Sequence, residues 1–279
     1  MSEILWLGDE RCHDVSLVGA KAANLSQLAE IHLVPPGFAL SAVASSVGLT
    51  EDLATGVRRA YRTLAELSRL SNPRVAVRSS AIDEDGAGAS FAGQHDTYLN
   101  VIGEDDVVEA VVRCIASTQS PEALAYREQR GLQSEDPSIA VLVQQLVESE
   151  VSAVVFSANP ITQDLDEVFI NSSWGLGESV VSGTVTPDTY VLRKADFSLI
   201  SRQIAIKENM TVMVPGGVDE VPIPAGDQER PSLNASEAIE MARLAIKLER
   251  VMGWPADVEC AIGYGELYLL QCRPITTMG

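Results

Sequence analysis

The feature that most constrains the fold is a pair of alternating segments near the end of the chain. They flank Gly263-Tyr264-Gly265-Glu266, and so short a connection joins only antiparallel strands. A three-residue loop over 264–266 would place Glu259 opposite Gln271. Directly opposed residues share a face, and Arg273 follows one pleat further along it. The sequence therefore predicts a hairpin that gathers a carboxylate, an amide and a guanidinium on one face.

These three side chains form a candidate ligand set. Carboxylate and amide oxygens are the hard ligands that Mg²⁺ prefers, and a neighbouring Arg suits a phosphate group. The spacing leaves a second interpretation open, in which the hairpin is half-exposed and its outer face is merely polar. The hypothesis to test is a metal and phosphate site with Glu259 and Gln271 as metal ligands.

Hydrophobic periodicity predicts a mixture of helices and strands along the rest of the chain. Helices are predicted from near Gly19 to 29 and over 54–70, 105–117 and 234–252. In the helix over 54–70, the apolar face is formed by Val57, Tyr61, Leu64 and Leu67. Strands are predicted over 75–80, 97–101, 139–147, 152–157, 168–170, 190–192 and 199–200. The Pro- and Gly-rich segment 209–231 is predicted to be an irregular connection. This pattern indicates an α+β fold, with strands clustered in the second half.

Composition excludes several classes of protein. The 46% of apolar and 21% of charged residues are typical of a globular protein. Twenty Lys and Arg against 39 Asp and Glu give a net charge of −19, which disfavours nucleic acids and anionic membrane surfaces as partners. No run of apolar residues is long enough to cross a membrane, and the start of the chain does not read as a secretory signal. We expect a soluble, cytoplasmic protein.

Two further segments could bind phosphate. Small residues over 83–93 follow the strand that carries Arg78, and they would let the backbone approach a phosphate chain. Lys21 lies near the start of a helix, which can form an anion site with it. An exposed acidic turn and a solvated lysine are the competing interpretations. No Walker A loop, dinucleotide fingerprint or nucleophile elbow is present.

The order of the motifs is more specific than any one of them. The segments are Gly19-Ala-Lys21, Val34-Pro-Pro-Gly-Phe38, Val77-Arg-Ser-Ser-Ala81, Ser90-Phe-Ala-Gly-Gln94, Gly175-Leu-Gly-Glu178, Thr186-Pro-Asp-Thr-Tyr190 and Leu270-Gln-Cys-Arg-Pro-Ile-Thr276. Together they resemble the N-terminal nucleotide-binding domain of the phosphoenolpyruvate synthase, pyruvate phosphate dikinase and rifampin phosphotransferase family. The resemblance implies a two-lobed ATP-grasp fold with mainly antiparallel sheets, and ATP and Mg²⁺ as cofactors. Residues 1–137 would form the N-terminal lobe with the phosphate-covering loop, and 138–279 the C-terminal lobe with the metal-binding hairpin.

The resemblance also implies roles for individual residues. It assigns the ATP phosphates to Lys21 and Arg78, the phosphate-covering loop to Gly93 and Thr97, the adenine to Gln144, Mg²⁺ to Glu259 and Gln271, and the transferring phosphates to Arg273. Lys21, Arg78 and Arg273 are the expected catalytic residues, because phosphoryl transfer requires neutralised phosphate charge. His95, beside the Gly-rich loop, is a weaker candidate for a base or a transient acceptor.

The sequence departs from the family in one respect that bears on function. Family enzymes continue into a swivelling domain with a phosphorylated His, usually just after a Ser, and none of the three His here follows a Ser. We therefore expect an ATP- and Mg²⁺-dependent phosphotransferase that phosphorylates a small-molecule acceptor directly. One alternative is the ATP-binding subunit or fragment of a split dikinase, with the phosphohistidine domain on another chain. A non-catalytic nucleotide-binding module and a carboxylate-activating ligase are further alternatives.

Overall fold

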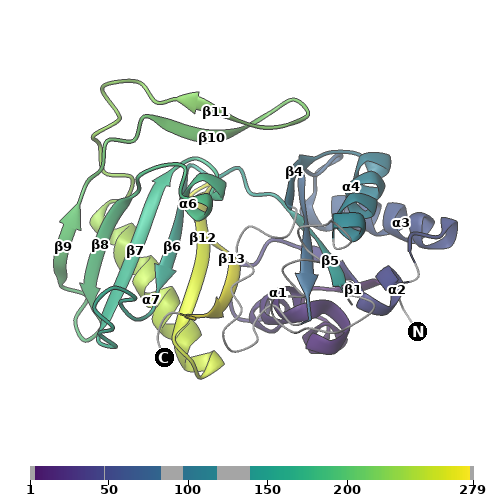
Figure 1. The fold of residues 1–279 in the computed structure, drawn as a ribbon, viewed down its shortest axis with the longest axis horizontal. Helices are drawn as coiled ribbons and strands as arrows, with labels where there is room; N and C mark the ends of the chain where they lie inside the picture. The colour runs from purple at the N-terminus through teal and green to yellow at the C-terminus, as the bar shows by residue number, and fades with distance from the viewer. Residues whose placement is uncertain (1–3, 47, 83–96, 118–138, 277–279) are drawn as a thin grey trace. The chain divides into compact units, whose positions relative to one another are not determined.

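The computed structural model describes residues 4–46, 48–82, 97–117 and 139–276 (Figure 1). The chain divides into two compact units, Met1–Leu146 and Val147–Gly279. Every pair of neighbouring strands described in the sheets is antiparallel. The predicted α+β class with mainly antiparallel sheets is confirmed. Among the described helices, none is long and apolar enough to cross a membrane.

The first unit is built on a five-stranded sheet with the order β1-β2-β5-β3-β4. Its strands are β1 (Ile4–Trp6), β2 (Gly37–Leu40), β3 (Val75–Ala81), β4 (Thr97–Val101) and β5 (Ile139–Gln145). Its helices are η1 (Glu10–His13), α1 (Val15–Leu28), α2 (Ala42–Ser46), α3 (Glu51–Ser68) and α4 (Glu104–Ser117). The predicted strand over 139–147 thus pairs with β2 and β3, so the units divide after Leu146 rather than at 137.

The two faces of this first sheet have different characters. Alternate residues of β3 and β5, such as Val75 and Val143, join a buried cluster with α3 and α4. The predicted α3 face is correct for Val57, Tyr61 and Leu64, which are buried. The prediction that Leu67 belongs to this buried face is wrong, because Leu67 is 58% exposed in the last turn of the helix. The residues that alternate with these, including Arg78, lie on the opposite face, against which α1 packs.

The second unit contains a six-stranded sheet with the order β13-β12-β6-β7-β8-β9. Its strands are β6 (Val151–Phe156), β7 (Glu167–Trp174), β8 (Asp188–Arg193), β9 (Leu199–Gln203), β12 (Ala256–Gly263) and β13 (Glu266–Pro274). Helix α7 (Ala235–Met252) packs across β12, β6, β7 and β8, and the short α6 (Glu178–Ser182) follows β7 (Figure 1). The Asn234 side chain and Glu237 form the predicted capping box of α7.

The segment predicted to be irregular contains regular structure. Residues 209–231 include a two-stranded hairpin, β10 (Asn209–Val214) and β11 (Gly217–Pro222). Pro222 ends the second strand and Gly216 occupies a positive φ of 86° in the turn. Prolines and glycines therefore mark the ends of this hairpin and do not prevent it, since none of them interrupts the ladder between its strands.

Candidate functional site

Lys21 is positioned by an interruption in helix α1. Gly19 has φ 73° and ψ 163°, which is not helical, so a second helical segment begins just after it. A Cβ at Gly19 would lie 2.3 Å from the backbone oxygen of Ser80, so only glycine permits this approach to β3. The Ser80 hydroxyl accepts a hydrogen bond from Ala22 N (3.2 Å), and Lys21 Nζ donates to Ser79 O (3.2 Å). The kink thus brings the Lys21 ammonium beside β3.

We expect Gly19→Ala to lower the free energy of unfolding by about 2–3 kcal/mol, because the added Cβ would collide with the Ser80 backbone in addition to straining a positive φ. Chemical denaturation followed by circular dichroism measures the change. Gly8→Ala is a matched control, because Gly8 also has a positive φ of 95° but no heavy atom within 4 Å of an added Cβ. If the two variants lost equal stability, the close approach to Ser80 would contribute nothing.

Arg78 and Thr97 lie opposite each other on β3 and β4. Arg78 Nε is buried and has no hydrogen-bond partner among the described residues, whereas Thr97 is exposed. A buried guanidinium N–H without a partner is costly, so the position favours an acceptor from outside this set. The predicted loop residue Gly93, and also His95, lie outside the described residues.

Gln144 lies on β5 opposite Ala76, two residues from the position of Arg78 on the neighbouring strand. Its side chain is buried, and its Nε2 donates a hydrogen bond to Pro35 O at 3.1 Å. That bond ties β5 to the Val34-Pro35-Pro36-Gly37-Phe38 segment. One of the two N–H donors of the side chain is therefore engaged by the protein, and a role for Gln144 at an adenine stays a prediction.

In the second unit, Glu259 of β12 and Gln271 of β13 are directly paired. The predicted three-residue loop is wrong, because Tyr264 and Gly265 form a two-residue turn with φ of 55° and 77°. A bulge between Glu259 and Cys260 then shifts the register by one residue and restores the predicted pair. Glu259 is half-buried and Gln271 buried, and their side chains share a face.

Arg273 lies one pleat beyond this pair and is held by Asp257. Its Nε donates to Asp257 Oδ2 at 2.9 Å, and the two residues are paired in register. Asp257 Oδ1 is buried without a hydrogen-bond partner in the described part of the chain. Burial raises the pKa of Asp257 above its ordinary value, while Arg273 acts in the opposite direction. Asp257 was not among the predicted site residues, although its alternation with Glu259 is visible in the sequence.

The predicted residues therefore form two groups, one in each unit. The first unit holds Lys21, Arg78 and Thr97 near one another on β3 and its neighbours, and the second holds Glu259, Gln271 and Arg273 on the β12–β13 hairpin. Within the described ranges, no three His, Cys, Asp or Glu side chains cluster as a metal site. The hairpin group offers two oxygen ligands and a cation, which suit a divalent cation and a phosphate group. The first group offers two cations, which by themselves suit phosphate.

Comparisons with known proteins show which family the chain is similar to. Residues 39–279 match the family described as pyruvate phosphate dikinase, AMP/ATP-binding domain. The chain is 36% identical, over 100% of its length, to a probable phosphoenolpyruvate synthase of Methanocaldococcus jannaschii, of which it covers 27%. It is 37% identical, over 94% of its length, to an uncharacterized phosphotransferase of Bacillus subtilis, of which it covers 34%. The chain thus spans about a third of the length of these relatives.

Among solved structures, a D-alanine–D-alanine ligase from Bacillus anthracis is similar with a TM-score of 0.39. The alignment covers 98% of this chain and 60% of the ligase at 12% sequence identity.

Proposed function

The chain belongs to the family of the pyruvate phosphate dikinase AMP/ATP-binding domain, and on this premise we propose that it binds Mg²⁺ and ATP and transfers a phosphoryl group. The observation that carries the proposal is the Glu259–Gln271 pair with Arg273 one pleat along, inside the matched region. A nucleotide-binding module without phosphoryl transfer would have no need of this full set of cations and metal ligands. A cytoplasmic location, where ATP is available, is part of the proposal.

The residues of both units fit the proposed ligands. Arg78 presents a buried N–H without a described partner, as expected of a group that donates a hydrogen bond to a phosphate oxygen. Glu259 and Gln271 offer a carboxylate and an amide oxygen, which are suitable Mg²⁺ ligands, and the buried Asp257 Oδ1 beside them adds negative potential. When bound, Mg²⁺ would supply neutralisation of the phosphate charge.

The chain's own cations would perform the remaining work. Lys21 and Arg78 would hold the phosphate chain and reduce its charge, so that a nucleophile can approach. Arg273 would stabilise the charge that spreads over the transferring group, and its bond to Asp257 fixes the direction of its guanidinium. A fixed guanidinium contributes more than a mobile one, because no reorganisation is needed during the reaction.

Two acceptors are compatible with this site. The first is a small molecule that receives the phosphoryl group directly. The second is a His on a carrier domain, in the same protein or on another chain, and the greater length of the relatives favours it. The expected products differ, because direct γ-phosphoryl transfer releases ADP, whereas in dikinase chemistry the β-phosphoryl group goes to the His, the γ-phosphoryl group goes to water as phosphate, and AMP is released.

We expect the chain to bind Mg²⁺·ATP, and Lys21→Ala and Arg78→Ala to weaken binding about tenfold or more, since each removes a hydrogen bond to a charged group. Isothermal titration calorimetry measures the dissociation constants of the wild-type chain and the two variants.

Incubation with labelled ATP and separation of nucleotides, small molecules and protein then identifies the acceptor. Turnover that required an added His-bearing protein would contradict direct transfer, and no nucleotide affinity with Mg²⁺ present would contradict the proposed function.

A further inference from the structure

A row of directly paired residues crosses the second sheet at the level of the proposed metal ligands. Gln271 pairs with Glu259, Glu259 with Val154 on β6, Val154 with Asn171 on β7, and Asn171 with Thr189 on β8. Directly opposed residues in antiparallel strands share a face, so all five side chains rise from the same side of the sheet. The row therefore extends the Glu259–Gln271 pair across three further strands.

This face is the one that α7 leaves uncovered. Residues that alternate with the row, such as Val155, Ile170 and Tyr190, are buried on the side where α7 packs. Glu259, Val154, Asn171 and Thr189 are each only half-buried. A ligand held by Glu259 would therefore have the rest of this row beside it.

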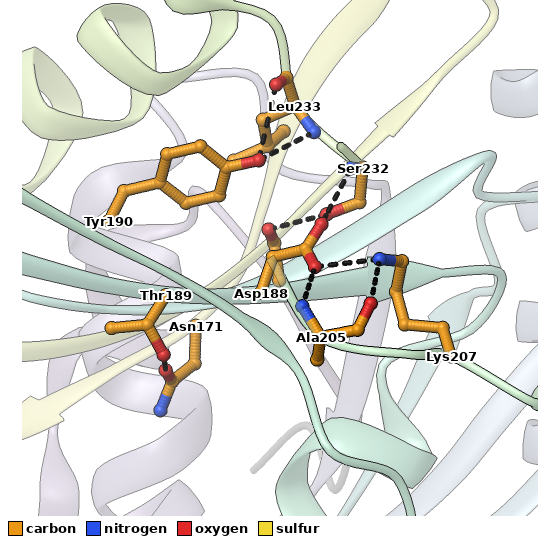
Figure 2. A network of polar contacts seen from close by, with 9 residues as sticks. Asn171, Asp188, Thr189, Tyr190, Ala205, Lys207, Ser232 and Leu233 are labelled. Carbon is orange, nitrogen blue, oxygen red and sulfur yellow. Dashed lines mark hydrogen bonds and ion pairs between the residues drawn. The ribbon is translucent and has the colours of Figure 1, made fainter. Parts of the chain in front are cut away.

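Asn171 has a fixed orientation in this row. Thr189 Oγ1 donates a hydrogen bond to Asn171 Oδ1 at 3.0 Å, and Figure 2 shows the amide nitrogen directed away from Thr189. Within the described residues this nitrogen has no hydrogen-bond partner of its own. Since Thr189 already occupies one lone pair of the carbonyl oxygen, the amide N–H groups are what Asn171 offers to a ligand as donors.

The two residues that flank Thr189 on β8, Asp188 and Tyr190, are each held by hydrogen bonds (Figure 2). Asp188 accepts hydrogen bonds from Lys207 Nζ (2.6 Å), Ala205 N (2.9 Å) and Ser232 N (2.7 Å), all on the other side of the sheet. The Tyr190 hydroxyl donates to Leu233 O at 3.2 Å. These contacts hold the start of β8 in place, so Thr189 keeps Asn171 pointing in one direction.

From this placement we propose that Asn171 is a nucleotide-binding residue and Thr189 its positioning residue. The Asn171 amide donates a hydrogen bond to an oxygen in the phosphate–ribose part of the nucleotide held by the Glu259–Gln271 pair. Asn171 lies two strands from Glu259, about 9.5 Å between their Cα atoms, so it contacts the nucleotide beyond the ion. Val154, between them, forms an apolar floor. The inference rests on the proposed function and adds a residue to it.

The test measures the dissociation constant for Mg²⁺·ATP by calorimetry. We expect Asn171→Ala to weaken binding about tenfold, the effect of one lost hydrogen bond to a charged or strongly polar oxygen. Thr189→Val should weaken binding by less, Thr189→Ser should retain wild-type affinity, and the Asn171→Ala/Thr189→Val double variant should match Asn171→Ala alone, because Thr189 acts through Asn171. Gln203→Ala is the matched control, since Gln203 lies opposite Thr189 in the same row but is exposed on β9.

Two probes identify the oxygen that accepts the bond. If Asn171→Ala weakens Mg²⁺·tripolyphosphate as much as Mg²⁺·ATP, the acceptor is a phosphate oxygen. If it weakens only ATP and leaves tripolyphosphate unchanged, the acceptor is on the ribose, and Asn171→Asp should then retain affinity, because a carboxylate can accept from a ribose hydroxyl. Either result supports the proposal.

Wild-type affinity in Asn171→Ala, or an equal loss in Gln203→Ala, would overturn the inference while leaving the proposed function intact. An absence of Mg²⁺·ATP binding in the wild-type chain would overturn both. Thermal unfolding of each variant, with the melting temperature unchanged, shows that a loss of affinity does not come from a loss of folding.

Discussion

Lys207→Met is expected to lower the free energy of unfolding by about 3–5 kcal/mol. The Lys207 and Asp188 side chains are fully buried and 2.6 Å apart, so the substitution leaves a buried carboxylate without its cation. Donors from Ala205 and Ser232 remain, but they do not neutralise the charge. Urea denaturation followed by circular dichroism measures the loss.

Lys194→Met is the control for this effect. Lys194 Nζ lies 2.7 Å from Glu249, a similar distance, but both side chains are partly exposed, at 15% and 27%. Water can solvate the remaining Glu249, so the expected loss is about 1 kcal/mol or less. Adding Asp188→Asn to Lys207→Met should recover part of the stability by removing the unpaired charge. Equal losses for the two lysine variants would show that burial of the Lys207–Asp188 pair does not determine its effect.

Glu259→Gln is expected to reduce ATP turnover on the order of 10²–10³-fold, the usual effect of removing one group that stabilises transition-state charge. The substitution keeps the shape of the side chain and removes the negative charge that would hold Mg²⁺. The dependence of turnover on Mg²⁺ concentration should also move to higher concentrations. Steady-state assays over a range of Mg²⁺ concentrations, with the nucleotide products identified, provide the measurement.

Glu266→Gln is the matched control, because Glu266 lies at the exposed tip of the same hairpin and should leave turnover unchanged. The exchange Glu259→Gln/Gln271→Glu returns a carboxylate to the pair and should recover part of the activity. Unchanged Mg²⁺ dependence in Glu259→Gln would contradict the assignment of this hairpin as the metal site.

Short-range patterns predicted most of the regular structure. The Val75-Ala76-Val77 segment that follows Pro73 predicted β3, and Asn234 with Glu237 predicted the start of α7, because propensity and capping act between residues near in sequence. The order of the motifs also predicted the family, which the match over residues 39–279 confirms. The error at Leu67 has a tertiary cause, because only the position of the packed elements decides where the buried face of α3 ends.

The β12–β13 hairpin shows where reasoning from local sequence fails. Glu259 and Gln271 were correctly paired, yet the predicted loop was wrong, and a bulge compensated for the shorter turn. Alternation by itself does not reveal a bulge, because the extra residue depends on how the strand packs against its neighbours.

The sequence by itself determined the α+β class and the family, and it supplied the proposals for Lys21, Arg78, Glu259 and Gln271, because these depend on periodicity and on motifs that can be read locally. Only the tertiary structure decided which residues meet. It placed β5 in the first sheet, held Arg273 on Asp257, and brought Asn171 into the row of Glu259 through two strand pairings. Pairing between strands far apart in sequence depends on the packing of the whole sheet, so no local pattern specifies it.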